Sequence, residues 1–468
     1  MVTQVASTDR RQPSCVVVEM IDRRNAADAE PLTLCSMPTT LPPVEAPRAL
    51  AGKRGARLRE ALRDQLVWGR IDLDALVADH HPVRCILAVT LRLELSALYH
   101  PIEARDEVAG APAIDPAILL ALWVYATSEG VGSARELWRL TREHVAYRWL
   151  CGGVAVGYHT LSDFRTERGE GFSQLISQVL ALLMQQQLVE LHRVAQDGTR
   201  VRASAGAGSF RREPTLDALM QQARAHLAAI MGEAADPALG ARRTAARRRG
   251  AQDRIERLEA ALAQIPDVTA TKQRSGAKDT TIRVSTTDPD ARVMKMGDGG
   301  FRPAFNIQFA TTTDLARVIV GVDASNRGSD MGLSTPMLAQ IEQRTGVRPT
   351  ELLVDGGYTQ HHAIDAAAAQ QVTVFAPVPK PRNGDTRDPH AARDGDSAAV
   401  AAWRARMGTD DAKQIYKQRA ATAETVNADA KTHRGLDHLS VRGLGNVLAS
   451  ATLFALTYDL LRLIALHG

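Results

Sequence analysis

The spacing of apolar side chains predicts a helical region in the first half of the chain. Apolar residues recur at intervals of three and four between residues 56 and 188, for example over 118–126. Two helix starts are marked by Asp115-Pro116 and by Ser133 with Glu136 three residues later, which is a capping box. We therefore expect a compact all-helical domain over residues 56–190.

Beyond residue 190 the period changes, and strands alternate with helices. This order predicts an α/β unit over residues 191–468. A pair of apolar stripes, separated by Asp236-Pro237 and Gly240, predicts a helical hairpin inserted at about 212–280. The other expected elements are strands at 194–203, 305–309, 318–322, 352–354 and 372–376, and helices at 363–370, about 413–432 and 446–466.

Two segments need a separate interpretation. Residues 1–55 are rich in proline and show no sustained period, so we expect a flexible leader. Residues 447–466 are apolar enough to suggest a membrane span, but they include Asp459 and Arg462. Either charge costs roughly 2.5–3.5 kcal/mol at a bilayer centre. We therefore predict a buried helix, no membrane partner and a cytoplasmic, nucleoid-associated protein.

Composition excludes several classes of protein. The 468 residues carry a formal charge of +4, which excludes a histone-like polycation and an acidic disordered chain. All four cysteines lie in the first third without metal-site spacing, so neither a disulfide framework nor a zinc module is indicated. Charge is unevenly distributed, however: residues 191–250 hold eleven arginines, no lysine and five acids. The densest run is Arg242, Arg243, Arg247, Arg248 and Arg249.

Three acids occupy positions that suggest metal chemistry. Asp197 lies in the first strand of the α/β unit, Asp355 follows a buried strand, and Glu424 lies on a later helix. Ligands bind beyond the carboxyl ends of strands in open α/β sheets, and clustered carboxylates hold Mg²⁺. Each acid also has a plainer reading. Asp197-Gly198 and Asp355-Gly356 are turn signals, and Glu424 is compatible with a solvated helix face.

The motifs around these acids resemble those of DDE-class insertion-sequence transposases. The motifs of the α/β unit are DGTRVRAS at 197–204, LVDGGY at 353–358, the Tyr416, Arg419, Glu424 and Lys431 series, HRGLDHLSVRGLG at 433–445 and ALTYDLLR at 455–462. Further motifs resembling the N-terminal domain of that group are DHHPVR at 79–84, Asp115-Pro116, GVGSAREL at 130–137, RWLCGG at 148–153 and HTLSDFR at 159–165. The resemblance spans residues 65 to 468 in order.

This resemblance implies an α/β ribonuclease-H-like catalytic core with a helical insertion, preceded by an all-helical N-terminal DNA-binding domain. Asp197, Asp355 and Glu424 would be catalytic and would bind Mg²⁺, as two ions, with Mn²⁺ able to substitute. Tyr416, Arg419 and Lys431 would contact DNA phosphates. The implied function is metal-dependent cleavage at the terminal inverted repeats of an insertion sequence, followed by strand transfer into target DNA. The implied assembly is a homodimer on paired ends.

The spacing of the third motif raises a structural question. Tyr416 and Glu424 are eight residues apart, one more than the commonest family spacing. On an unbroken α-helix, Arg419 would point about 140° away from Glu424. Either the helix begins after Arg419, or a bulge absorbs the extra residue.

Further DNA contacts are expected outside the acidic site. The arginine run at 242–249 suits phosphate binding, although a solvated helix face would look the same. Arg165 lies on a segment that resembles the start of a recognition helix, whose alternative is a capped helix packed in a bundle. Two other functions stay open: a ribonuclease-H-like host nuclease or resolvase without a joining step, and a catalytically inactive DNA-binding relic.

Overall fold

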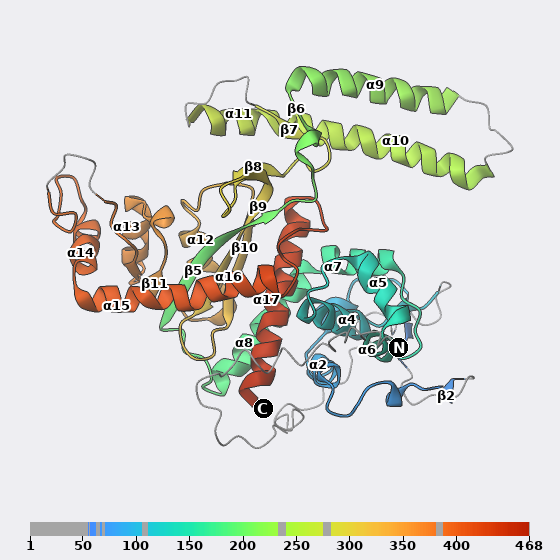
Figure 1. The fold of residues 1–468 in the computed structure, drawn as a ribbon, viewed down its shortest axis with the longest axis horizontal. Helices are drawn as coiled ribbons and strands as arrows, with labels where there is room; N and C mark the ends of the chain where they lie inside the picture. Colours follow the sequence, from blue (N-terminus) through green and yellow to red (C-terminus); the bar gives the residue numbers. More distant parts are fainter. Residues whose placement is uncertain are drawn as a thin grey trace, which may run out of the picture.

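The computed structural model describes residues 55, 57–61, 66–67, 71–104, 111–232, 240–274, 282–380 and 387–467. Apart from residue 55, the leader expected at 1–55 lies outside these residues. Figure 1 shows a central sheet with a helical region on one side and a separate helical projection above it.

Helices dominate the N-terminal region, as the apolar period predicts. The start signals act as expected, since Asp115 accepts a hydrogen bond from the Ala117 N–H and Ser133 accepts one from Glu136. Two short strand pairs, β1 with β4 and β2 with β3, depart from the all-helical expectation. The helices are α2 (Pro82–Thr90), α3 (Ser96–Tyr99), α4 (Pro116–Ser128), α5 (Ala134–Glu143), α6 (Val145–Cys151), α7 (Tyr158–Glu167) and α8 (Gly169–Gln185); the strands are β1 (Leu58–Arg59), β2 (Leu66–Val67), β3 (Ile71–Asp72) and β4 (Ala113–Ile114).

The central sheet has the strand order β10-β9-β5-β11-β12, with β8 paired to β9. Strand β9 runs antiparallel to β5 and β10, whereas β11 runs parallel to β5 and β12. The expected hairpin at 305–322 is therefore confirmed. The strand bounds are β5 (Arg193–Arg202), β8 (Arg292–Lys295), β9 (Phe301–Thr312), β10 (Ile319–Ser325), β11 (Glu351–Leu353) and β12 (Thr373–Phe375).

Helices cover both faces of this sheet. Ala195, Leu353 and Phe375 pack against α14 and α15, while Leu352 and Val374 face the other way. Helices α12 and α14 had no counterpart among the expected elements. The bounds are α12 (Ser334–Thr345), α13 (His361–Ala369), α14 (Ala398–Met407), α15 (Asp410–Arg419), α16 (Thr425–Thr432) and α17 (Leu444–His467); a π-helical segment, Ala420–Glu424, joins α15 to α16.

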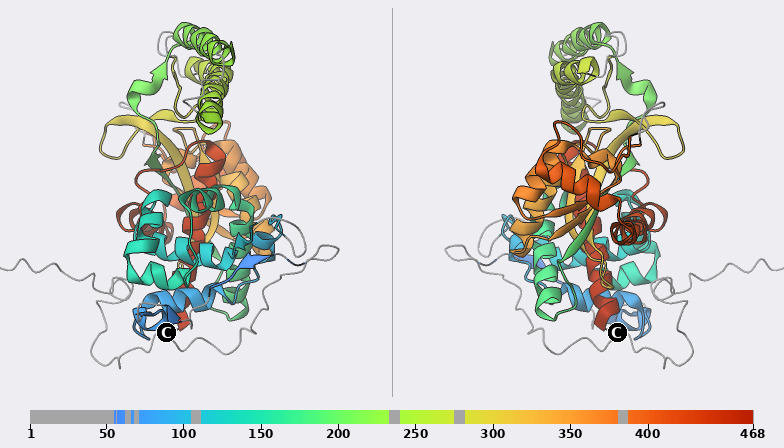
Figure 2. Two further views of the ribbon diagram at one scale, coloured as in Figure 1. Left: turned by 90° about the vertical axis from the view of Figure 1, so that its right-hand side faces the viewer. Right: turned by 90° about the vertical axis from the view of Figure 1, so that its left-hand side faces the viewer.

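The inserted hairpin is present between β5 and β9. It consists of α9 (Glu213–Gly232) and α10 (Gly240–Ala263), followed by α11 (Ile265–Arg274). These helices bury a core of their own, which includes Leu216, Ile255 and Leu258. Strands β6 (Phe210–Arg211) and β7 (Val284–Ser285) pair at its base. The insertion thus projects from the sheet on a two-stranded stalk (Figures 1 and 2).

Helix α17 connects the N-terminal helices to the sheet. It packs against α4, α7 and α8 on one side and against β9 and β10 on the other. It is long and apolar enough to cross a membrane, but 78% of its most apolar window is buried inside the protein. One continuous hydrophobic core therefore runs from the N-terminal helices through α17 into the sheet. The helical region and the sheet thus share one core, through α17.

Candidate active site

Strand pairing brings Asp197 and Asp355 to the same level of the sheet. In the parallel β5–β11 pair, Ala195 lies opposite Leu353. Asp197 and Asp355 each lie two residues further along, so both are on the face that Ala195 and Leu353 occupy. Neighbouring strands are about 4.8 Å apart. Parallel register therefore juxtaposes two acids that are far apart in the sequence.

The third acid reaches this face through the π-helical segment. Residues Ala420–Glu424 form a π-helix within an otherwise α-helical stretch that runs from Asp410 to Thr432. The additional residue between Tyr416 and Glu424 is accommodated in this segment. Of the two alternatives given above, a later helix start and a bulge, the structure has the bulge. Glu424 ends the segment with its side chain 58% exposed.

Arg419 joins the first and third acids. Its Nη2 lies 2.8 Å from Oδ1 of Asp197, and its Nη1 lies 3.3 Å from Oε1 of Glu424. The guanidinium is nearly buried, with 11% of the side chain exposed. The orientation that an unbroken α-helix would impose, with Arg419 turned away from Glu424, does not occur, because the bulge turns the two side chains towards each other.

Burial and charge act in opposite directions on Asp197. Burial and the neighbouring carboxylate of Asp355 raise its pKa, and Arg419 counteracts this shift. The Asn427 amide donates to Oδ2 of Asp197 over 3.0 Å, which fixes the carboxylate. The site therefore holds more negative charge than the arginine alone compensates.

Tyr416 and Lys431 flank this cluster. Burial raises the pKa of Tyr416, and the charge of nearby Arg419 opposes that shift. Burial and the neighbouring Arg200 lower the pKa of Lys431, while Asp197 opposes the shift. The structure thus places Tyr416, Arg419 and Lys431 within electrostatic reach of Asp197.

A fourth acid, Asp330, lies in the same region and was not recognised from the sequence. It does not cap the following helix, because α12 begins after Leu333 with no side-chain cap. Oδ1 of Asp330 instead accepts hydrogen bonds from the side-chain amides of Asn306 (2.7 Å) and Gln308 (2.8 Å). The available signal in the sequence was the pair of polar residues on β9. Asn306 and Gln308 alternate with apolar core positions, so their side chains needed a polar partner inside the protein, and Asp330 is that partner.

Glycines next to two of the acids make room for this network. A Cβ on Gly198 would lie 2.4 Å from Oδ1 of Asp330 and 2.3 Å from Nε2 of Gln308. A Cβ on Gly357 would lie 2.9 Å from Oδ1 of Asp355. The hydroxyl of the buried Tyr358 donates to Gln308, so the network extends to the loop that carries Asp355. Close approach therefore requires glycine at positions 198 and 357, whereas a Cβ on Gly356 would make only an ordinary contact with Pro377, at 3.7 Å.

The residue types of the site fit a divalent cation. Carboxylate oxygens are hard ligands suited to Mg²⁺ or Mn²⁺, and Asp197, Asp355 and Glu424 supply them here. Among the described residues, no three acid, histidine or cysteine side chains are grouped closely enough to hold one ion. Arg419 stands between Asp197 and Glu424, so binding of a shared ion requires that its guanidinium withdraw.

Arg165 is a buried side chain and not an exposed DNA contact. Only 6% of the residue is exposed, its guanidinium lies 4.5 Å from the centre of the Trp123 ring, and Nη1 donates to the Gly132 carbonyl. Burial lowers its pKa to about 10. The expectation of a DNA-contacting Arg165 is corrected accordingly, because the bundle-packing alternative describes this side chain.

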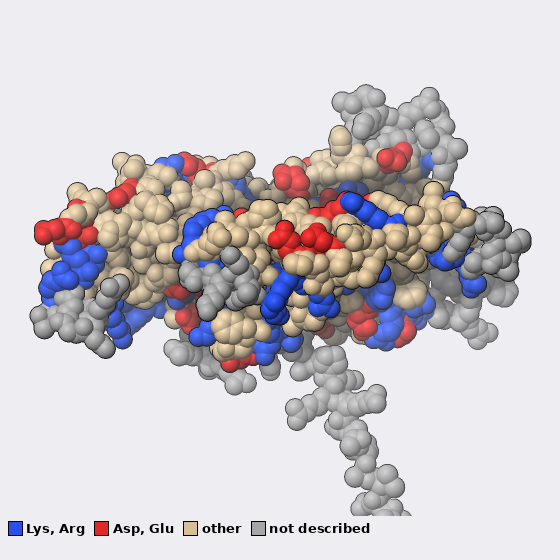
Figure 3. Space-filling model, turned by 90° about the horizontal axis from the view of Figure 1, so that it is seen from above, with Lys and Arg blue, Asp and Glu red and all other residues tan. Residues whose placement is uncertain are grey.

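The arginine run lies on the insertion. Arg242, Arg243, Arg247, Arg248 and Arg249 are all exposed on α10. Seen from the side of the insertion, basic and acidic side chains are interspersed over the surface (Figure 3). The run is thus accessible to DNA without forming part of a single uninterrupted basic face in this view.

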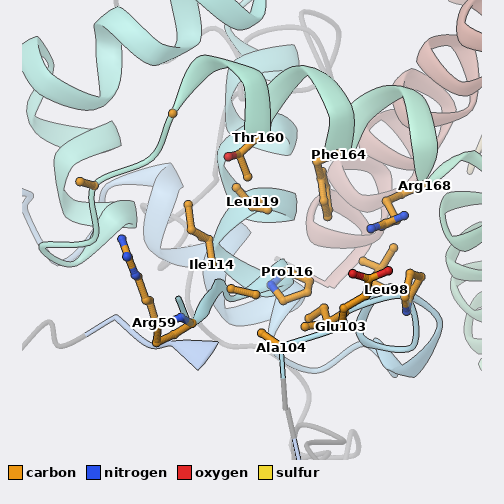
Figure 4. A pocket seen from close by; sticks show the side chains of 16 residues that line it. Arg59, Leu98, Glu103, Ala104, Ile114, Pro116, Leu119, Thr160, Phe164 and Arg168 are labelled. Carbon is orange, nitrogen blue, oxygen red and sulfur yellow. The ribbon is translucent and has the colours of Figure 1, made fainter. Parts of the chain in front are cut away.

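A pocket in the N-terminal region lies apart from the acidic site. It has a volume of about 630 Å³ and is lined by residues of the β1–β4 pair, α4 and α7. Figure 4 shows Ile114, Leu119 and Phe164 in its wall, with Glu103 and Arg168 at one side. None of the three proposed catalytic acids lines this pocket.

Comparisons with known families match two separate parts of the chain. Residues 71–167 match a family described as a transposase domain (DUF772), and residues 383–464 match a transposase DDE domain. The second match contains Tyr416, Arg419, Glu424 and Lys431. Neither the curated proteins nor the solved structures gave a match.

Proposed function

We propose that this chain, which its two transposase domains place with the insertion-sequence DDE transposases, binds the terminal inverted repeats of its element, cuts there and joins the freed ends to target DNA. The observation that carries this proposal is the convergence of Asp197, Asp355 and Glu424 around Arg419. Such transposases act on DNA and generally use divalent metal ions.

The strand order supports the proposal that the catalytic region has a ribonuclease-H-like fold. Three strands form an antiparallel meander, β5-β9-β10, and β11 and β12 extend it in parallel on the other side of β5. A sheet of this order presents Asp197 on its middle strand and Asp355 on the adjacent parallel strand. The helical insertion falls between the first and second strands, where residues 212–280 were expected to provide it.

In the proposed mechanism, Asp197, Asp355 and Glu424 would hold two Mg²⁺ ions. Bound ions of this kind activate the attacking oxygen and stabilise the leaving oxygen of an in-line phosphoryl displacement. Asn427 orients the Asp197 carboxylate through its 3.0 Å hydrogen bond. Arg419 offsets part of the charge of Asp197 and Glu424 before the substrate is bound, and on release its guanidinium is available to a DNA phosphate. Tyr416 and Lys431 add contacts to the same strand.

Cleavage and joining use different nucleophiles, namely water and the 3′-hydroxyl of the DNA. A water molecule attacks the phosphodiester at the element end, and the leaving 3′-oxygen takes a proton to become a free 3′-hydroxyl. That hydroxyl then attacks a target phosphodiester, so one P–O bond forms as another breaks. We propose that two copies of the chain act on paired ends.

The experiment that tests this function uses the DNA that flanks the reading frame. The full chain is incubated with Mg²⁺ and a duplex carrying the element end, together with a supercoiled target plasmid. We expect nicks at the element boundary and covalent joining of the end to the plasmid. Cleavage without joining would favour a host nuclease or resolvase, and binding without cleavage in Mg²⁺ or Mn²⁺ would identify an inactive relic. Either result would contradict the proposed function.

A further inference from the structure

A polar groove of about 670 Å³ lies between the N-terminal helices and the segment that precedes α17. One wall comes from the start of α5 and from α7, and the other from residues 438–442 and Asn446. Ser204, just beyond the end of β5, forms part of its floor. The groove thus lies where the helical region and the catalytic sheet meet.

The wall formed by residues 433–443 is anchored to both regions. The Leu439 N–H donates to the Arg202 carbonyl over 2.8 Å, and the Arg202 N–H donates to the Asp437 carbonyl over 3.1 Å. On the other side, Gly435 approaches Gly130 so closely that a Cβ on Gly435 would lie 2.4 Å from the Gly130 carbonyl oxygen. The groove is therefore a fixed feature that extends the end of β5 towards the N-terminal helices.

Positive charge predominates in this groove. Three arginines line it, of which Arg135 and Arg442 are exposed and Arg165 is buried, and Asp163 is the one acid among its lining residues. Nε of Arg442 donates to the Ser204 carbonyl over 3.2 Å, which orients the guanidinium at the groove floor. Arg135 lies with its guanidinium carbon 5.5 Å from the centre of the Tyr158 ring. The Tyr158 ring and the Ser204 carbonyl thus orient these two cations, and Arg442 also lies near enough to Asp288 to act to lower the pKa of that carboxyl, against the larger effect of its burial.

We infer that this groove binds the sugar-phosphate backbone of duplex DNA, with Arg135 and Arg442 as its two phosphate contacts. Exposed arginines, serine hydroxyls and the N-terminus of a helix are the groups that contact DNA phosphates. Here the groove presents Arg135, Arg442, Ser162 and the start of α5. Arg165 also lines this groove, but it is buried against Trp123, so the two phosphate contacts are assigned to the exposed Arg135 and Arg442.

The position of the groove relative to the acids suits a bound element end. Ser204 is seven residues beyond Asp197 in the chain and two beyond the end of β5, and a fully extended chain of this length spans roughly 23 Å. That length matches about seven base pairs, at 3.4 Å per step. This inference rests on the proposed function: a duplex cut at Asp197 would pass through the groove within its first turn.

The test measures the salt dependence of DNA affinity for the full chain. The probe is a fluorescent 40-base-pair duplex from the element end, and an unrelated duplex of the same length serves for comparison. Each phosphate contact adds about 0.9 to the slope of log affinity against log salt concentration. We expect R135Q/R442Q to lower the slope by about 1.8 on both duplexes and to weaken binding about tenfold or more at 100 mM NaCl.

Two control variants separate the groove from general charge and from folding. The first control is R139Q. Arg139 lies one turn beyond Arg135 on α5, and its replacement removes one positive charge, as each groove substitution does. Arg139, however, is already paired with Glu136 and Glu143. We expect its slope to equal that of the wild type. R135K/R442K keeps both charges and is expected to restore most of the slope, which a folding defect would not permit.

Three results would overturn the inference. An unchanged slope in R135Q/R442Q would exclude the groove while leaving the proposed function intact, provided that wild-type cleavage persists. An equal loss in R139Q would show a general charge effect. A change in oligomeric state without a change in slope would indicate that a second copy of the chain covers the groove. Absence of any DNA binding by the wild type would instead contradict the proposed function together with the groove.

Discussion

The Nη2 atom of Arg419 lies 2.8 Å from the Oδ1 atom of Asp197, although the two residues are 222 positions apart in the chain. The π-helical segment Ala420–Glu424 makes this contact compatible with a second one from Arg419 to Glu424. A regular α-helix would place Arg419 and Glu424 about 140° apart. The local irregularity therefore assembles the site around one guanidinium.

This geometry makes the length of the segment testable. Deletion of the exposed Ala421 leaves Arg419 and the glutamate four residues apart, which is about 40° on a regular α-helix. We expect the deletion variant to retain cleavage within about tenfold of the wild type. Insertion of one alanine after Ala421 moves the glutamate a further 100° and is expected to cost about 100-fold or more. Cleavage rates that rank the two variants in the opposite order would contradict the role of the bulge.

Asp330 is expected to matter for the reaction through the residues it holds. It accepts hydrogen bonds from Asn306 and Gln308, and Gln308 in turn accepts one from Tyr358. D330N replaces one accepting oxygen by a donor, so we predict a fall in cleavage of about 10- to 100-fold, with a higher metal concentration at half-maximal rate. D323N, which changes a half-buried acid on β10, is the matched control. An unchanged metal dependence in D330N would show that Asp330 has a structural role only.

Arg165 is expected to contribute to stability and not to DNA binding. Its guanidinium is buried against Trp123 and bonded to the Gly132 carbonyl. We predict that R165A lowers the free energy of unfolding by about 2 kcal/mol, through the lost hydrogen bond and cation–π contact. Urea denaturation gives the stability, and the salt slope of DNA binding is expected to match that of the wild type. A slope lower by about 0.9 would reinstate Arg165 as a phosphate contact.

Asp459 is expected to make stability depend on pH. It is fully buried on α17, where its Oδ1 accepts the Ile319 N–H over 2.8 Å. Burial raises its pKa well above the usual value, against the opposing effects of the Ile319 N–H, Arg344 and Arg462. The folded state thus binds this proton more tightly than the unfolded chain, so the free energy of unfolding falls as pH rises above the ordinary carboxyl range.

The D459N variant isolates this effect. It keeps an oxygen for the Ile319 N–H and removes the titration, while any cost of its buried amide is independent of pH. We expect the stability of the wild type relative to D459N to decrease between pH 5 and pH 8 in urea denaturation. A difference that is the same at both pH values would show that the pKa of folded Asp459 is not raised above about 5 and would contradict this account.

The pattern of apolar and polar residues predicted the main strands and helices of the catalytic region better than it predicted the contacts between their side chains. Strand β5, the β9–β10 hairpin and the buried helix α17 follow from apolar periodicity and length. Helices α12 and α14 were missed, because neither presents a clear apolar stripe in the sequence. The burial of Arg165 depends on Trp123, 42 residues away, and the Asp330 network depends on strand register. Such relationships arise from tertiary packing, which no local window contains.

The proposed metal triad is tested most directly by one comparison of cleavage and binding. D355A removes a carboxylate that sits level with Asp197, outside the hydrophobic core, so the fold and the DNA contacts are expected to persist. We predict that the full-length variant binds the element-end duplex with wild-type affinity and salt slope but produces no Mg²⁺-dependent cleavage. Cleavage at the wild-type rate by D355A would contradict the assignment of Asp355, and with it the proposed active site.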